Sequence, residues 1–249
     1  MRDGSLAMTY DAELYALVHD GAPGDVEFYL RVTEPGQRVL ELGAGWGRIS
    51  DALRKEGREV VALESDAGMR ALAGSRHPEV DVRAGDMSRF ALEERFDRVL
   101  IPFTGLYCLE SEAAVAACFA AARAHLVDGG ALIFDAYAAD AFHEESLPED
   151  YPDDQLEEVA KVAHDGRALT VFEKSSWDRE AQRMDATYVY MDDASGDVVH
   201  EGTIAHRYLL AAQVERLLEE AGLKLEASFG GFDGRPFGQG GSMIVIATR

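Results

Sequence analysis

The sequence predicts an α/β fold in which helices cover both faces of a doubly wound, mostly parallel sheet. Three observations support this class. Short apolar runs alternate with helix-patterned segments between residues 37 and 136, as in successive βα units. A glycine-rich turn follows the first of these runs. After residue 136 the alternation stops, and three strand-like runs joined by short turns predict an inserted antiparallel meander.

The charge balance limits the partners of this 249-residue chain, whose 46 acidic and 24 basic residues give a net charge of −22. Such a surface repels phosphate backbones and anionic lipids, so we expect a small-molecule partner, with no nucleic acid and no membrane. No signal peptide or membrane-spanning run is visible, and Cys108 and Cys118 are too few for a disulfide framework or a metal cluster. We therefore expect a cytoplasmic protein without a metal. Its oligomeric state is left open, a homodimer included.

Two short helices are expected before the first strand, between residues 10 and 33. A Gly/Pro-containing break separates them, and Asp25 is placed to cap the second. The segment is rich in hydroxyl-bearing rings, among them Tyr10 and Tyr15. We interpret it as a lid, with simple packing against the sheet edge as the alternative.

The turn after the first strand is the most informative segment. Residues 38–50 read RVLELGAGWGRIS, a short apolar run followed by Gly43, Gly45 and Gly47 and then a helix. This arrangement presents backbone N–H groups and a positive helix end to a ligand, and glycine removes the Cβ atoms that would keep the ligand away. Glu41 lies inside the buried strand, where a carboxylate is costly unless it is paired. We therefore expect a cationic partner for Glu41.

Two ligand classes use such a turn. Dinucleotide sites have the pattern G-x-G-x-x-G, and here Arg48 occupies the position of the third glycine. An acid beside the glycines also suits a cationic ligand better than a pyrophosphate. A nicotinamide-dependent oxidoreductase is thus the less favoured alternative. A non-catalytic cofactor-binding protein and a ligand-free turn stay open.

The second strand, residues 59–63, ends at Glu64, about twenty residues after the first glycine, where an acid can accept hydrogen bonds from ribose hydroxyls. Ser65 and Asp66 then cap a helix in which Met69 is either an adenine contact or a core residue. This part of the sequence supports nucleoside binding in either ligand class.

The third and fourth strands, residues 80–83 and 96–101, complete the first half of the sheet. In such sheets ligands bind outside the carboxyl ends of the strands. We therefore expect the loop after the fourth strand to form the floor of the reaction site. Tyr107 in this loop and Tyr15 are candidate walls of the substrate pocket. The remaining elements are expected in this order: a helix at 112–126, a strand at 131–135, an acid-rich loop at 144–158, strands at 168–177, 184–191 and 198–209, a helix at 211–221, and strands at 223–229 and 243–248.

Residues 39–135 resemble the core of the class I S-adenosylmethionine-dependent methyltransferases. The resemblance rests on the segments VLELGAGWGR, VVALESD, AGDM, FDRVLIPF and LVDGGALIFD. Members that modify nucleobase amines or glutamine have an Asn/Asp-Pro-Pro-Tyr tetrad after the fourth strand; this chain has Ile-Pro-Phe there, which counts against those substrates. The plan of the whole chain is similar to small-molecule members such as the amino-sugar N,N-dimethyltransferases and glycine N-methyltransferase.

The resemblance implies a Rossmann-like seven-stranded sheet with its last strand antiparallel, and S-adenosyl-L-methionine as cofactor with S-adenosyl-L-homocysteine as product. It implies that the lid closes over the cofactor, that the glycine turn and its acid hold the methionyl part, and that acids after the second and third strands hold ribose and adenine. The cofactor-binding residues expected on this basis and from the motifs above are Tyr10, Glu41, Gly43, Ala44, Gly45, Glu64, Ser65, Met69, Asp86, Met87 and, through its backbone, Ile101.

Methyl transfer from a sulfonium is an in-line displacement, so the protein mainly has to align the acceptor and exclude water. An amine acceptor needs only to arrive unprotonated, whereas a hydroxyl needs a base. His206, on the third insert strand, is the first candidate base and His143 the second, each with a structural role as the alternative. Asp233 and Arg235 are candidate substrate ligands, or partners within their own loop.

We expect one methyltransferase domain over residues 1–249, with a helical lid at 1–36, the cofactor-binding core at 37–136, the insert over the active site at 137–210, and the last helix and strands at 211–249. The expected acceptor is a nitrogen, or an oxygen, of a small molecule. Nitrogen is preferred because an acidic protein suits a cationic amine. An O-methyltransferase with His206 as base is the alternative.

Overall fold

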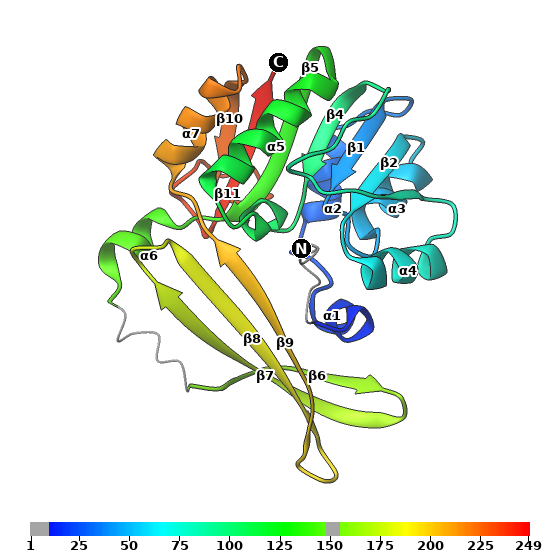
Figure 1. Cartoon of the computed structure of the whole chain (residues 1–249), viewed down its shortest axis with the longest axis vertical. Coiled ribbons are helices and arrows are strands. Elements are labelled where there is room, and N and C mark those ends of the chain that lie inside the picture. Colours follow the sequence, from blue (N-terminus) through cyan, green and yellow to red (C-terminus); the bar gives the residue numbers. More distant parts are fainter. Residues whose placement is uncertain (1–9, 148–154) are drawn as a thin grey trace, which may run out of the picture.

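The computed structural model describes residues 10–147 and 155–249 of the chain, and Figure 1 shows two sheets of different size joined at one end. Residues 1–9 of the predicted lid and residues 148–154 of the predicted acid-rich loop lie outside the described residues. Within these ranges no helix is both long and apolar enough to cross a membrane.

The larger sheet has seven strands in the order β10-β11-β5-β4-β1-β2-β3. The first five strands of the chain run parallel, and β11 runs antiparallel to both of its neighbours. This confirms the predicted doubly wound α/β sheet with an antiparallel last strand. Its strands are β1 (Arg38–Leu42), β2 (Glu59–Glu64), β3 (Asp81–Ala84), β4 (Phe96–Ile101), β5 (Leu126–Tyr137), β10 (Lys224–Phe229) and β11 (Ser242–Thr248).

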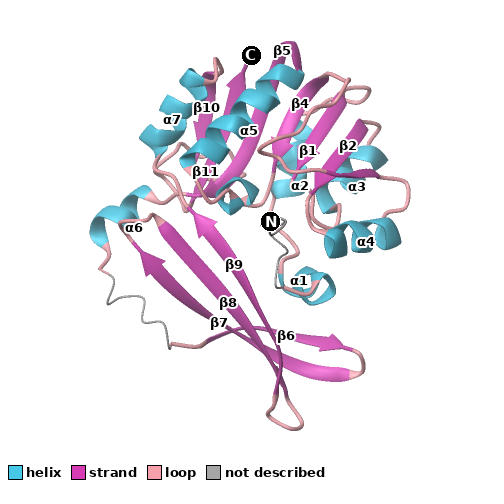
Figure 2. Cartoon of the chain, in the orientation of Figure 1, coloured by secondary structure: helices cyan, strands magenta, loops and turns pink. Residues whose placement is uncertain are grey.

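Helices cover both faces of this sheet (Figure 2). The face that carries Leu40, Val99 and Phe134 packs against α5 (Glu112–His125) and α7 (Ala211–Glu220). The opposite face packs against α2 (Asp25–Arg31) and α3 (Arg48–Lys55). The remaining helices are α1 (Ala12–Val18), α4 (Ala67–Arg76), the short 3-10 helix η1 (Gly105–Cys108) and α6 (Asp140–Glu145). Because side chains alternate across a strand, the two apolar sets of each strand bury against different helix layers.

The second sheet is antiparallel and has four strands in the order β6-β7-β8-β9. The sequence predicted three of them: β7 (Arg167–Asp178), β8 (Arg183–Asp192) and β9 (Val198–Arg207). The prediction missed β6 (Glu157–His164), whose first residues belong to the segment interpreted as an acid-rich loop. Its signal is a short alternation in which Ala160 and Val162 turn toward an apolar cluster.

Helix α1 lies between the two sheets, where it contacts α4 on one side and β6 on the other (Figure 1). Leu14 of this helix packs in a cluster with Leu169 and Val171 of β7 and with Tyr188 and Tyr190 of β8. The inner face of the small sheet therefore faces α1 and the carboxyl end of the large sheet.

Candidate active site

The glycine turn lies at the carboxyl end of β1 and leads into α3. Gly43, Gly45 and Gly47 have φ values of +67°, +55° and +82°, a left-handed backbone that side chains other than glycine rarely adopt. A Cβ atom built on Gly45 would meet nothing within 4 Å. The turn thus borders open space, and its backbone is accessible to a ligand.

Glu64 at the end of β2 fixes the shape of this turn. Its Oε2 accepts from the backbone N–H of Gly45 at 2.7 Å, and its Oε1 accepts from the N–H of Asp66 at 2.8 Å. The side chain is buried, with 7% of the residue exposed. Each carboxylate oxygen has a second lone pair, so both oxygens remain able to accept from ribose hydroxyls.

Glu41 is buried as predicted, but its expected cationic partner is absent among the described residues. The hydroxyl of Ser50 donates to Glu41 Oε2, and the nearest guanidinium, that of Arg48, is bound to Asp25. Burial raises the pKa of Glu41 to about 7, an effect that the Ser50 hydrogen bond and the Arg48 charge only partly oppose. Glu41 is therefore a carboxylate whose charge the protein alone does not neutralise.

Arg48, the residue that departs from the dinucleotide pattern, connects α3 to α2. Its Nη2 and Nη1 donate to the two carboxylate oxygens of Asp25 at 2.5 and 3.0 Å. Asp25 is 4% exposed and is the first residue of α2 rather than its cap, a position that Gly24 takes. The predicted cap is wrong because the carboxylate is used by Arg48 and by the N–H of Ala22.

The charges around the turn fit a cationic ligand. The carboxylates of Asp25, Glu41 and Asp135 raise the pKa of Arg48 by electrostatic attraction. The carboxylate of Glu64 raises the pKa of Glu41 by repulsion. Three carboxylates thus act on one guanidinium in a largely buried region, and a fourth, that of Glu64, acts on Glu41. An ammonium or sulfonium would relieve this imbalance, whereas a pyrophosphate would increase it.

Comparison with known proteins agrees with this geometry. Residues 39–130 match the family of the methyltransferase domain. The dTDP-3-amino-3,6-dideoxy-alpha-D-glucopyranose N,N-dimethyltransferase of Streptomyces fradiae is 28% identical over 232 residues, which are 90% of this chain and 88% of the relative. The dTDP-4-amino-2,3,4,6-tetradeoxy-D-glucose N,N-dimethyltransferase of Saccharopolyspora spinosa is 26% identical over 90% of this chain and 89% of its own length.

Solved structures extend the similarity to the whole fold. CalS10, an amino pentose methyltransferase from Micromonospora echinaspora in its S-adenosylmethionine-bound form, is 25% identical with a TM-score of 0.66, covering 90% of this chain and 88% of its own. The CcbJ methyltransferase from Streptomyces caelestis has a TM-score of 0.80 at 22% identity, over 97% and 98% of the two chains.

The matched domain, the relatives and the solved structures together support a class I S-adenosylmethionine-dependent methyltransferase. The expected enzyme class and cofactor are thereby confirmed, and the nicotinamide-dependent alternative is set aside.

The residues expected to hold the adenine lie in the segments after β2 and β3. Met69, in the first turn of α4, is 2% exposed, and the neighbouring Ser65 hydroxyl lies 3.5 Å from Glu64 Oε1. Asp86 Oδ1 accepts from the backbone N–H and the hydroxyl of Ser88 at 2.8 and 2.7 Å. Met87 lies beside the turn, because a Cβ on Gly43 would meet its Sδ and Cε at 3.9 Å.

The other two expected cofactor residues are core positions whose side chains are buried. Ala44, within the turn, is 7% exposed, and Ile101, the last residue of β4, is fully buried. Neither side chain is available to a ligand, and the resemblance assigns Ile101 through its backbone.

The tyrosines of the N-terminal segment differ in what they face. The Tyr10 hydroxyl is 2.6 Å from that of Tyr190, and its ring stacks on Tyr188, so Tyr10 joins α1 to the small sheet. The pKa of Tyr15 is instead affected by the charges of Glu64 and Arg48 at the glycine turn. Tyr15 thus lies within electrostatic range of the glycine turn, whereas the Tyr10 side chain is committed to the small sheet.

The two predicted base candidates lie in different surroundings. His143 of α6 places its Nδ1 2.8 Å from the hydroxyl of Tyr208, which also accepts from the indole N–H of Trp177 at 2.9 Å. This network matches the structural alternative for His143. His206 of β9 lies near the rings of Tyr107 and Tyr137, with centroids 6.4 and 5.9 Å away. Burial lowers the pKa of His206 to about 4, so the imidazole is neutral at pH 7.

Tyr107 is fully buried, and its hydroxyl donates to the carbonyls of Tyr137 and Leu209 at 3.1 Å each. The hydroxyl is therefore committed to the junction between the two sheets. Its ring is part of the hydrophobic core, so the predicted role as a pocket wall finds no exposed surface in the structure.

His19 was missed by the sequence interpretation. It directly follows α1, its Nε2 is buried without a hydrogen-bond partner, and burial lowers its pKa to about 4. Its ring centroid is 4.2 Å from that of Tyr15, 4.6 Å from Tyr188 and 6.3 Å from Phe103. The charge of His206 also affects the pKa of His19. The available signal was a histidine at the end of the tyrosine-rich helix.

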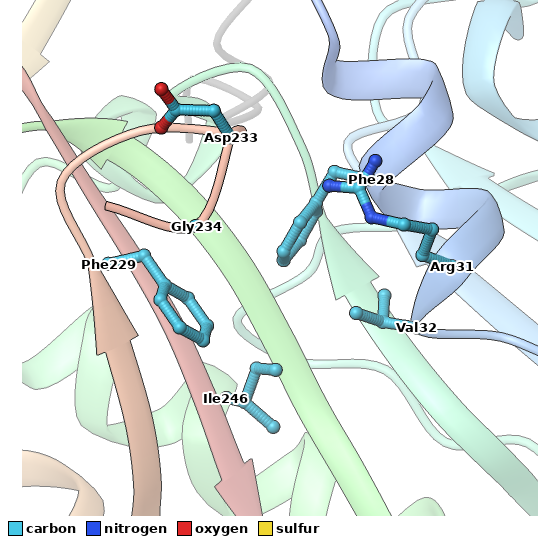
Figure 3. A pocket seen from close by; sticks show the side chains of 7 residues that line it. All are labelled: Phe28, Arg31, Val32, Phe229, Asp233, Gly234 and Ile246. Atoms are coloured by element: carbon cyan, nitrogen blue, oxygen red, sulfur yellow. The ribbon is translucent and has the colours of Figure 1, made fainter. Parts of the chain in front are cut away.

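Asp233 and Arg235 bind each other, as the loop-internal alternative expected. Two bonds of 2.9 and 2.5 Å join Arg235 Nε and Nη2 to the two oxygens of Asp233, and both side chains are more than half exposed. Asp233 also borders a cavity of about 340 Å³ between α2 and the β10–β11 edge of the sheet (Figure 3). Its lining residues are Phe28, Arg31, Val32, Phe229, Asp233, Gly234 and Ile246. No residue of the glycine turn lines this cavity.

Proposed function

We propose that this methyltransferase transfers a methyl group to the amino nitrogen of an amino sugar or a similar small amine. One observation carries the proposal. The two sugar N,N-dimethyltransferases align with about nine tenths of this chain, so the similarity includes the insert as well as the cofactor core. The insert faces the carboxyl end of the large sheet, where acceptors bind in doubly wound folds.

The bound cofactor supplies an electrophilic methyl group on a positively charged sulfur. We assign its methionyl part to the backbone of Gly43 and Gly45 and to the carboxylate of Glu41, and its ribose to Glu64. Asp86, Met69 and Met87 are assigned to the adenine. The open space beside Gly45 and the unneutralised charge of Glu41 support this assignment.

We assign the acceptor to the ring-lined region formed by Tyr15, His19, Phe103, Tyr188 and His206. These side chains come from α1 and the residue after it, the loop after β4 and the small sheet. Ring contacts of His19 connect it to Tyr15, Phe103 and Tyr188, and His206 is near enough to affect the pKa of His19. Aromatic walls exclude water, which favours displacement at an aligned nucleophile. The partnerless Nε2 of His19 is an acceptor for an amine N–H.

The pKa of His206 weighs against the O-methyltransferase alternative. A hydroxyl acceptor needs a base whose pKa lies near the working pH, and an imidazole with a pKa of about 4 is a poor one. An unprotonated amine needs no such base.

The net charge of −22 supports the proposal that the partner is a small molecule. Nucleic acids and anionic membranes are not expected as partners, because long-range repulsion opposes both. The absence of cysteine-rich motifs in the sequence is in keeping with a cytoplasmic location.

The test compares matched acceptors. Purified protein is incubated with S-adenosylmethionine and a nucleotide-linked amino sugar. A parallel reaction contains the same sugar with a hydroxyl in place of the amine. The masses of the products are measured by mass spectrometry. We expect mass increases of one or two methyl groups on the amine alone. Methylation of the hydroxyl compound, or of neither compound nor any other small amine, would contradict the proposal.

A further inference from the structure

The loop after β4 has an unusual backbone. Phe103 and Thr104 are consecutive non-glycine residues with φ values of +52° and +61°, both in the left-handed region. This conformation costs free energy in residues that have a Cβ, and it persists only where the surroundings impose it. The loop directly follows β4 at the edge of the sheet to which we assign the acceptor.

The group that imposes this shape is Asp135 of β5. Its Oδ1 accepts from the backbone N–H of Phe103 at 2.9 Å, and its carbonyl accepts from the N–H of Thr104 at 3.1 Å. The hydroxyl of Tyr29 on α2 donates to the same Oδ1 at 2.5 Å. Asp135 is 6% exposed and Tyr29 is fully buried, so water does not compete for these bonds.

The loop is also connected to both halves of the candidate site. The guanidinium of Arg48, next to the glycine turn, lies 5.9 Å from the centre of the Phe103 ring. On the other side the Phe103 ring contacts His19. A shift of Phe103 would therefore change the space between the cofactor turn and the acceptor region.

We propose that Asp135, fixed by Tyr29, is a positioning residue that holds Phe103 and Thr104 in the left-handed shape required to align the acceptor. This inference rests on the proposed function for the location of the acceptor, and it gives Asp135 a role beyond the charge that it contributes near Arg48. Asp135 touches neither reactant; it acts through the loop.

The left-handed backbone provides a test that separates positioning from general stability. Glycine adopts the left-handed region as readily as the right-handed one, so a glycine at position 104 lowers the cost that Asp135 otherwise has to overcome. Alanine at the same position removes the same side chain but keeps the cost. Thr104→Gly and Thr104→Ala are thus a matched pair.

We expect Asp135→Ala to lower kcat for the amine about a hundredfold, because an acceptor displaced by about 1 Å loses that much rate. The Kd for S-adenosylhomocysteine should change less than threefold. Adding Thr104→Gly to Asp135→Ala should restore kcat at least tenfold, and adding Thr104→Ala should not. Asp97→Ala serves as the control, since Asp97 likewise accepts a backbone N–H, from Arg38 at 2.8 Å, but at the opposite end of the sheet.

A second readout needs no acceptor. Hydrogen exchange in the peptide covering residues 102–107 should accelerate at least tenfold in Asp135→Ala and stay unchanged in Asp97→Ala. The proposal is overturned if exchange in this peptide does not change, if glycine and alanine at position 104 act alike, or if kcat and S-adenosylhomocysteine affinity fall together. Failure of the proposed function looks different, because the unaltered protein would then transfer no methyl group to an amine.

Discussion

The proposed cofactor half and the proposed acceptor half of the candidate site consist of different chemical groups. The cofactor half uses bare backbone and carboxylates that lie close together in sequence, from the glycine turn to Glu64 and Asp86. The acceptor half uses aromatic rings and neutral imidazoles that come from α1, from the loop after β4 and from the small sheet. We therefore expect the first half to discriminate by charge and the second by shape, so that substitutions in each half affect different measured quantities.

The largest effect is expected at the turn. Gly45→Val places a β-branched residue at a φ of +55° and a side chain in the open space beside the turn, so affinity for S-adenosylhomocysteine should fall at least a hundredfold in calorimetry. Gly166→Val is the control, because Gly166 has a φ of +75° and equally open surroundings in a distant hairpin. Equal affinities of the two variants would disprove the assigned cofactor site.

The second substitution tests the acceptor half. His19→Ala removes a buried acceptor for the amine and should lower kcat about tenfold to a hundredfold, the cost of one lost hydrogen bond in a dry site, with cofactor affinity unchanged. His164→Ala, in the hairpin of the small sheet, should leave both quantities as they are. Steady-state kinetics measures kcat, and calorimetry measures the affinity for the cofactor. A loss of cofactor affinity in His19→Ala would contradict the assignment of His19 to the acceptor half.

Glu41→Gln should separate binding from stability. Glu41 has a pKa raised to about 7 by burial, so its ionised form destabilises the free protein above pH 7, and the stability that its protonated form contributes is lost as the pH rises through 7. Glutamine keeps the acceptor for Ser50 without the charge. At pH 8 the variant should unfold at higher denaturant, with a gain of up to about 3 kcal/mol.

The same variant should bind S-adenosylmethionine about tenfold more weakly at pH 8, because the attraction for the ammonium is lost. In the unaltered protein, affinity should fall about tenfold from pH 8 to pH 6 as Glu41 takes up a proton, and this pH dependence should disappear in Glu41→Gln. A variant that is less stable at pH 8, or equally pH-dependent, would refute the charge argument.

The smallest effect is expected at the exposed loop between β10 and β11. Arg235→Ala breaks the pair with Asp233, which solvent surrounds, so kcat and KM for the amine should stay within twofold of the unaltered values. A tenfold rise in KM would instead return Arg235 to the substrate site that the sequence suggested.

The sequence predicted the fold well because the fold depends on local patterns, and the expected cofactor residues were found from patterns of the same kind. Glycine spacing, apolar strands and acids at strand ends are all read within a few residues of each other. The same reasoning expected a cation beside Glu41, since a buried charge needs a partner. Arg48 binds Asp25 of α2 instead, which leaves the cofactor as the partner that we propose.

The acceptor half could not be predicted in the same way because long-range pairing creates it. His19 becomes notable only when the small sheet brings Tyr188 against it, and the strained loop at Phe103 is explained only by the carboxylate of Asp135, 32 positions later in the chain. The missed strand β6 has the same cause, because its weak alternation gains meaning only from pairing with β7.

The half-protonated state of Glu41 near pH 7 has a consequence for heat measurements. Arrival of a cationic methyl donor favours the ionised carboxylate, so loading at neutral pH should release a fraction of a proton into the medium. The apparent binding enthalpy would then vary with the ionisation enthalpy of the buffer and would differ between Tris and phosphate. The slope of apparent enthalpy against buffer ionisation enthalpy would give the number of protons that this side chain releases.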